Sequence, residues 1–157
     1  MNRQTKIALL IVFSFWGYRM VKKYAFTKDE TEIMYLAKTI WGEARGESVK
    51  GQQAVANVIM NRVKKGGWYG ATVEEVVLKP YQFSCWNDTD PNFEKLQNLQ
   101  ANDPQLAGAL QIAKKAYYGQ LEDITGGAIN YHAKSVNPYW SKSMTKTANI
   151  GNHVFYA

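Results

Sequence analysis

Residues 40–63 read IWGEARGESVKGQQAVANVIMNRV and join the end of one predicted helix to nearly the whole of the next. Gly42 and Gly46 make it costly for one helix to continue through both of them, so the first helix is expected to end in this stretch, before Ser48. Ser48 is a favourable N-cap for a second helix over 49–65, in which apolar residues recur every three or four positions and the last turn is basic. This dense apolar pattern predicts a central position for the second helix.

Further helices are predicted on both sides of this stretch. Thr27 and Glu30 resemble a capping box at the start of the first helix, and Gly119 is expected to end the last one. The glycine-rich segment 66–72 and the polar, aromatic segment 81–92 are predicted to be loops. The remaining helices are expected, in chain order, over residues 27–41, 73–78, 91–99 and 104–118.

The sequence changes character near its C-terminus. AINYHA (128–133) and HVFYA (153–157) are rich in β-formers and have the length of strands, so we expect them to pair. Tyr131 and His132 would point to opposite faces of their strand, and either could face a cleft. The chain is therefore predicted to be a mainly helical α+β protein, a single domain with a small antiparallel sheet toward the C-terminus.

The net charge of +6 is concentrated at the N-terminus. The first 23 residues contain five of the 19 Lys and Arg and no acids, so the remainder has 14 basic against 13 acidic residues. A nearly neutral body lacks the basic patch of a nucleic-acid-binding protein, so no nucleic-acid partner is expected.

The N-terminal cations flank an apolar segment, IALLIVFSFWGY (7–18). As a helix it would be about 18 Å long, which suits the apolar part of an export signal better than a full membrane span. Bulky and basic residues follow where a cleavage site would need small ones. An uncleaved signal-anchor over 1–26, ahead of a catalytic domain over 27–157, is therefore expected; a buried core helix is the alternative.

Cys85 is the only cysteine in the chain, which excludes an intramolecular disulfide and a cysteine metal cluster. Its apolar and aromatic neighbours predict a small buried side chain rather than a nucleophile. His132 and His153 are 21 residues apart, with no local spacing that would join them as metal ligands. We therefore expect no metal and no cofactor.

Glu43 and Glu47 are the candidate catalytic carboxylates. Glu43 follows apolar residues at a helix end, and a carboxyl group partly buried there can keep its proton and act as a general acid. Glu47, next to Ser48, has a simpler use in pairing with Arg45 or with the start of the next helix. On spacing alone, a solvated helix end is the more common outcome for such glutamates.

Other polar and aromatic residues are candidates for substrate contacts. Arg62 lies on the apolar face of its helix, where a buried guanidinium needs carboxylate or carbonyl partners. It would either orient a carboxylate of the site or form a structural ion pair. Aromatic rings in predicted loops can stack on sugars or on bases, and the neutral body favours a glycan. These rings are Trp68, Tyr69, Tyr81, Trp86, Tyr139 and Trp140.

Five segments in order resemble the cell wall hydrolase family of the spore-cortex-lytic SleB/CwlJ type, which also occurs in bacteriophage lysis and virion proteins. They are IWGEARGES, GQQAVANVIMNRV, YQFSCW, GGAINYHA and IGNHVFYA. The resemblance implies a lysozyme-like domain that cleaves peptidoglycan between N-acetylmuramic acid and N-acetylglucosamine, with Glu43 as the catalytic glutamate.

Members of this family look like lytic transglycosylases, in which one glutamate acts first as acid and then as base. Substrate contacts or support are expected from Glu47, Gln82, Ser84, Trp86, Tyr131 and His132. Arg45, as the partner of Glu47, and Arg62 are expected to be structural support. Trp41 and His132 stand where the family commonly has tyrosine or another aromatic residue. If this chain is instead a hydrolytic muramidase, then Glu47, Asp88 and Asp90 are candidates for a second carboxylate; a peptidoglycan-binding virion module is the non-catalytic alternative.

The short, basic-flanked N-terminal segment fits a bacteriophage endolysin of the signal-anchor type or a virion-associated lysin. We expect a monomer whose partners are peptidoglycan and, through its N-terminus, the bacterial inner membrane. It would act in the cell envelope, anchored or periplasmic, and could also be carried by a virion.

Overall fold

The computed structural model describes residues 26–157. The apolar segment predicted to be a signal-anchor, 7–18, lies outside these residues. Within 26–157, no helix combines the length and the apolar composition that a membrane span needs.

The described chain is mainly helical and ends in a small sheet, as the sequence predicts. Its elements in chain order are α2 (Lys28–Ala44), α3 (Val49–Lys65), α4 (Val73–Val77), the 3₁₀ helix η1 (Ser84–Trp86), α5 (Phe93–Asn98), α6 (Ala107–Tyr117), β1 (Asn130–Ala133), the 3₁₀ helix η2 (Tyr139–Ser143), β2 (Lys146–Ile150) and β3 (His153–Tyr156).

The predicted starts of α2 and α3 are confirmed. At the start of α2, Thr27 and Glu30 form the capping box, with the Thr27 N–H 2.8 Å from Glu30 Oε2 and the Glu30 N–H 3.2 Å from Thr27 Oγ1. α2 continues through Gly42 and ends at Ala44, three residues past the predicted range. Ser48 then caps α3 by accepting the Gly51 N–H at 3.3 Å. Glu43 therefore lies in the last turn of α2.

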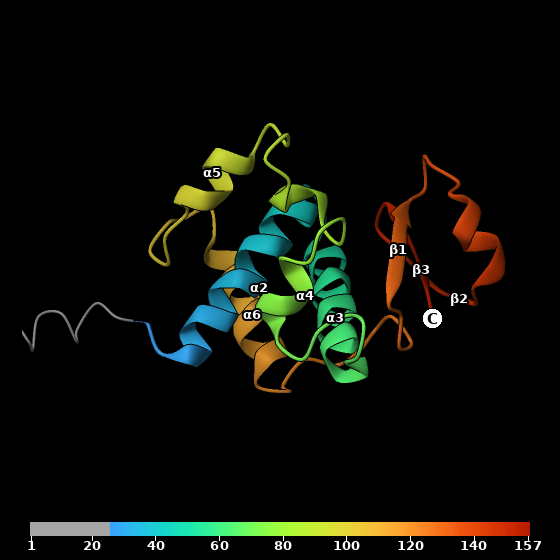
Figure 1. Ribbon diagram of the computed structural model, residues 1–157, viewed down its shortest axis with the longest axis horizontal. Coiled ribbons are helices and arrows are strands. Elements are labelled where there is room, and N and C mark those ends of the chain that lie inside the picture. Colours follow the sequence, from blue (N-terminus) through green and yellow to red (C-terminus); the bar gives the residue numbers. More distant parts are fainter. Residues whose placement is uncertain (1–25) are drawn as a thin grey trace, which may run out of the picture. The chain divides into compact units, whose positions relative to one another are not determined.

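α3 is the central helix, as its apolar pattern predicts. Figure 1 shows it between the other helices and the sheet, and it packs against α4, α6 and β2. Val55 and Ile59 are fully buried in the core formed by the helices, while Val58 is buried beneath the sheet against Phe155. Full burial of such a side chain stabilises the fold by roughly 1.5–3 kcal/mol. The sheet is thus anchored on the helix that follows Glu43.

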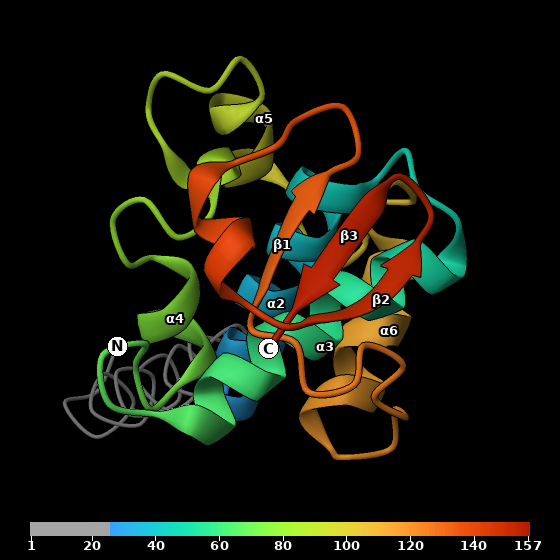
Figure 2. The same cartoon turned by 90° about the vertical axis from the view of Figure 1, so that its right-hand side faces the viewer.

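The sheet has three antiparallel strands in the order β1-β3-β2 (Figure 2). The pairing of β1 with β3 confirms the prediction, and Tyr131 lies opposite Phe155. β2 was not predicted, because most of its side chains are exposed and a bulge interrupts it between Lys146 and Ala148. The inner face of the sheet carries the tyrosine that reaches the candidate site.

The loop before β1 is held to α3 by Asp123. One carboxylate oxygen accepts the N–H and the hydroxyl of Thr125 at 2.8 and 2.6 Å. The other accepts the Gly127 N–H at 2.9 Å and the Asn61 amide at 3.0 Å. Burial alone would raise the pKa of Asp123, but these hydrogen bonds outweigh it and hold the pKa below its usual value. Asp123 therefore joins the loop that leads into β1 to α3.

Asp123→Asn is expected to lower the free energy of unfolding by about 1 kcal/mol at neutral pH. The loss is expected to be this small because Asp123 is exposed, and solvent weakens its interactions. Since the pKa of Asp123 is depressed in the folded state, its contribution is complete above the unfolded pKa, about 4, and is lost as the pH falls through the folded pKa. Urea unfolding should therefore show a difference in stability between the native protein and Asp123→Asn at neutral pH, and this difference should disappear at acid pH. Asp88→Asn, at an exposed position, is the control; a difference that persists in acid would contradict this role for Asp123.

Candidate active site

The Glu43 carboxylate, half-buried at the end of α2, accepts hydrogen bonds from two other segments. Its Oε1 accepts the Cys85 backbone N–H at 3.1 Å and the Ser84 hydroxyl at 3.4 Å, both from η1. Its Oε2 accepts the Tyr131 hydroxyl at 2.9 Å, from β1. The helix end, the loop and the sheet therefore converge on one carboxyl group, and Ser84 and Tyr131 are the predicted site residues that contact it.

The close approach of η1 to α2 depends on Gly42. A Cβ at Gly42 would lie 2.5 Å from the Cβ of Cys85 and 2.7 Å from its Sγ, closer than real contacts allow. Cys85 is 3% exposed, which confirms the predicted small buried side chain. Burial and the neighbouring Glu43 charge raise the pKa of the Cys85 thiol, so the side chain stays protonated and is a poor nucleophile. The role of Cys85 is to bring its backbone N–H to Glu43.

The Tyr131 hydroxyl is the hydrogen-bond donor that the sheet contributes to Glu43. Burial raises the pKa of its hydroxyl, the Glu43 charge raises it further, and the Arg62 charge opposes them only in part, so the group keeps its proton. The ring is stacked on Phe155, with centroids 5.7 Å apart, and meets the His153 ring edge at 5.2 Å. These contacts aim the hydroxyl at Glu43.

Arg62 is 6% exposed and donates to neutral oxygens. Its Nε donates to the Ile129 carbonyl at 2.7 Å, and its terminal nitrogens donate to the side-chain oxygens of Gln82 at 2.7 Å and Asn130 at 3.2 Å. The predicted carbonyl partner is confirmed. The alternative of a directly hydrogen-bonded carboxylate is wrong, because amide oxygens occupy those positions. Arg62 thus orients Gln82 and Asn130.

The predicted pairing of Glu47 with Arg45 is wrong. Glu47 accepts the Asn152 N–H at 3.1 Å and the Asn152 side-chain amide at 2.9 Å. Burial would raise the pKa of Glu47, but these bonds, with the His153 and Lys134 charges, lower it. Arg45 instead donates to the Gly42 carbonyl at 3.1 Å and lies over the Trp41 ring. Glu47 joins the α2–α3 turn to the β2–β3 turn.

Trp86 and His132, which are also predicted to contact substrate, interact with other residues of the protein. Trp86 donates its indole N–H to Thr39 Oγ1 at 2.9 Å and packs near Tyr35. His132 points to the opposite sheet face from Tyr131, where it stacks on Tyr156 and its Nε2 lies 3.0 Å from the Tyr156 hydroxyl. In the described part of the chain neither residue bonds to Glu43, so a substrate role for either remains only a prediction.

A pocket of about 370 Å³ adjoins Glu43 and shares Tyr131 with it. Arg62, Gln82, Asn130 and Tyr131 provide its polar groups. Trp68, Tyr69, Tyr81 and Trp140 line the rest with aromatic rings. Sequence reasoning missed Asn130, because a single amide before a strand carries no distinguishing signal. The aromatic composition and the amide groups suit a sugar ring.

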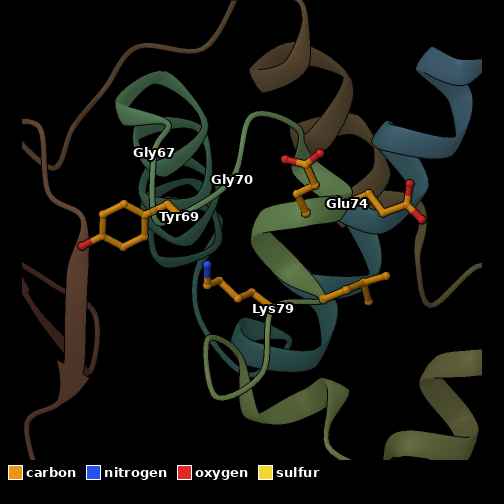
Figure 3. A pocket seen from close by; sticks show the side chains of 7 residues that line it. Gly67, Tyr69, Gly70, Glu74 and Lys79 are labelled. Atoms are coloured by element: carbon orange, nitrogen blue, oxygen red, sulfur yellow. The ribbon is translucent and has the colours of Figure 1, made fainter.

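A second hollow, of about 450 Å³, is lined by residues of the 66–72 loop and of α4 with the two residues Leu78 and Lys79 (Figure 3). Glu74 points away from Tyr69 and Lys79 there. Glu75 accepts the Ala71 N–H at 2.7 Å, and the Lys79 ammonium donates to the Trp68 carbonyl. Glu75 and Lys79 are thus hydrogen-bonded to the 66–72 loop, and the pocket beside Glu43 is the better candidate for substrate.

Tyr131→Phe is expected to lower kcat about tenfold, because Glu43 loses one of the donors that orient it, while the ring keeps its packing. KM and the thermal midpoint should change little. Tyr156→Phe is a matched control, since its hydroxyl bonds to His132 on the opposite sheet face. Muropeptide release measured for both variants tests this; equal turnover in the two would remove Tyr131 from the site.

A helical body with one glutamate at a helix end, hydrogen-bonded to a small antiparallel sheet beside a pocket of about 370 Å³, defines a lysozyme-like domain. The sequence gives the family directly. The Cell Wall Hydrolase family model matches residues 46–156, and the chain belongs to this family. The resemblance inferred from the five motifs is therefore confirmed.

Proteins similar to this chain include spore cortex-lytic enzymes. The one from Bacillus cereus is 29% identical over 134 residues, covering 81% of this chain and 44% of the relative. The one from Halalkalibacterium halodurans is 30% identical over 130 residues, covering 81% and 35% respectively. The chain thus spans less than half the length of these curated relatives.

Two solved structures have the same fold. The catalytic domain of the Bacillus cereus SleB protein aligns with a TM-score of 0.66 and 27% identity, over 85% of this chain and 94% of that domain. The catalytic domain of the germination-specific lytic transglycosylase SleB from Bacillus anthracis gives a TM-score of 0.65 and 27% identity, over 85% and 98%. The similarity therefore covers nearly the whole of each of these catalytic domains.

Proposed function

We propose that this protein cleaves the glycan strand of peptidoglycan between N-acetylmuramic acid and N-acetylglucosamine, by lytic transglycosylation with Glu43 as the single acid and base. The observation that supports it best is the carboxyl group of Glu43, held by donors from η1 and β1 beside an aromatic pocket. Family membership and the SleB relatives support the same substrate.

In the first step, protonated Glu43 donates its proton to the glycosidic oxygen as the bond from that oxygen to C1 of N-acetylmuramic acid breaks. The C6 hydroxyl of the same sugar then attacks C1 while the Glu43 carboxylate takes the hydroxyl proton. The product has a 1,6-anhydro ring, and Glu43 is protonated again. Tyr131 and Ser84 can follow this cycle because a hydroxyl rotates to donate or to accept.

The hydrolytic alternative needs a second group to activate water. Of the three candidate carboxylates, Glu47 is held by Asn152, and Asp90 accepts the Asn92 N–H at 2.8 Å and its side-chain amide at 3.3 Å. Asp88 is exposed on the same loop. The engagement of two of these groups favours the single-carboxylate route.

Mass spectrometry of muropeptides released from purified sacculi by the full-length protein tests the proposal. Anhydro ends are expected, and they are lighter than reducing ends by one water. Reducing ends would establish a muramidase instead. Binding to sacculi without any soluble product would establish the non-catalytic module.

We further propose that the protein acts in the bacterial cell envelope, held at the inner membrane by its N-terminal segment. The basic-flanked apolar run at 7–18 supports this proposal. Sedimentation of the full-length protein with membrane vesicles, lost when residues 1–26 are removed, is the expected result; equal sedimentation of the two forms would contradict it.

A further inference from the structure

The amide groups of the pocket beside Glu43 have a fixed orientation. Arg62 carries only donors, so the oxygen of each amide it contacts must face it. These are Oε1 of Gln82, at 2.7 Å, and Oδ1 of Asn130, at 3.2 Å. The NH₂ groups of both amides consequently point away from the guanidinium.

The two NH₂ groups then differ in their surroundings. Nδ2 of Asn130 lies 3.0 Å from the Met144 sulfur. Nε2 of Gln82, which lines the pocket, donates to no other residue in the described part of the chain. Gln82 thus offers the pocket a free N–H donor, whose natural partner is a carbonyl oxygen.

Tyr81, on the rim of the same pocket, has a costly backbone conformation. It is the third residue of the turn that the Gln82 N–H closes on the Lys79 carbonyl at 3.1 Å. Its φ is +66°, where glycine is the usual residue. The ring is 96% exposed, so no core packing compensates for the strain. Such strain persists most often where function requires it, and an exposed ring at a pocket is suited to stacking on a sugar.

We propose that this pocket selects N-acetylated sugars. Gln82 donates from Nε2 to the acetamido carbonyl of an N-acetylhexosamine unit, and Tyr81 covers the sugar ring. A de-N-acetylated sugar offers no carbonyl there and brings an ammonium group toward the buried Arg62 charge, which repels it. The inference rests on the proposed function, and it identifies Gln82 and Tyr81 as residues that set specificity between acetylated and de-N-acetylated glycan.

Binding to full-length Glu43→Gln protein separates this inference from the catalytic proposal. Calorimetry would compare tetra-N-acetylchitotetraose with fully de-N-acetylated chitotetraose at mildly acid pH, where the amines are protonated. The acetylated ligand is expected to bind at least about tenfold more tightly. Equal affinity, or no binding of either ligand at millimolar concentration, would overturn the inference. Muropeptide release by the native protein tests the catalytic proposal independently.

Variants of Gln82 test whether its Nε2 atom is responsible for the preference for the acetylated ligand. Gln82→Leu should reduce it to less than about threefold, because the donor is lost. Gln82→Glu keeps an oxygen on Arg62 but replaces the donor with a negative charge, so the preference should reverse. Gln111→Leu, at an exposed position on α6, should keep the full preference. A full preference retained in both Gln82 variants would overturn the assignment.

Tyr81→Gly is expected to raise the stability of the protein and to weaken its binding of the acetylated ligand. Relief of the positive φ should raise the thermal midpoint by about 2–4 °C. Loss of the ring should weaken binding of the acetylated ligand about tenfold. A merely structural tyrosine would lose stability without changing affinity, and that result would contradict its role.

Discussion

Glu43→Gln is expected to lower the rate of glycan cleavage about 10³-fold while the protein remains folded. The amide has the size of the carboxyl group and still offers an oxygen to the Cys85 N–H, so α2 and η1 should keep their packing. It can neither give a proton to the leaving oxygen nor take one from the C6 hydroxyl. Release of soluble muropeptides from sacculi, measured with the thermal midpoint of the same sample, provides the comparison.

Two other carboxylates are controls for this loss. Glu47→Gln removes a charge from the same motif, but its hydrogen bonds go to Asn152, so it should reduce stability and leave turnover within about threefold of the native value. Asp88→Asn tests a carboxylate that hydrolysis could use and should be silent. If Glu43→Gln retained activity and Asp88→Asn lost it, the acid would have been misassigned.

Local signals were sufficient for most of the fold. The Thr27–Glu30 box, the Ser48 cap and the Gly119 helix end each depend on a few neighbouring residues, and the structure confirms all three. β2 escaped prediction because most of its side chains are exposed, so it needs no alternating pattern. In this chain, caps and periodic faces determine where the helices begin and end.

The partners within the site could not be predicted in the same way. Glu43 and Tyr131 are 88 residues apart, and Glu47 and Asn152 are 105 apart. Arg45 was the expected partner of Glu47 because it is near in sequence, but folding brings the β2–β3 turn to this carboxylate. Glu43 itself emerged from the family resemblance, since helical spacing left it equal to Glu47.

Gly42→Ala is expected to destabilise the protein by about 2 kcal/mol and to lower turnover at least tenfold. The new methyl group would overlap Cys85, which is buried in the helical core and cannot turn outward. The available relief is a shift of η1 away from α2, which lengthens the bond from the Cys85 N–H to Glu43. One methyl group, outside the pocket, should therefore disturb both the fold and the acid, as urea unfolding and muropeptide release would show.

Two further variants test whether the contact between the new methyl group and Cys85 causes the loss of stability and turnover. Gly46→Ala lies in the same motif, and its Cβ would meet nothing within 4 Å, so stability and turnover should be retained. In Gly42→Ala/Cys85→Gly, the added methyl group takes space that the cysteine side chain vacates, and most of the lost turnover should return because η1 can again approach Glu43. A double variant no better than Gly42→Ala would mean that the overlap with Cys85 is not the cause of the lost turnover.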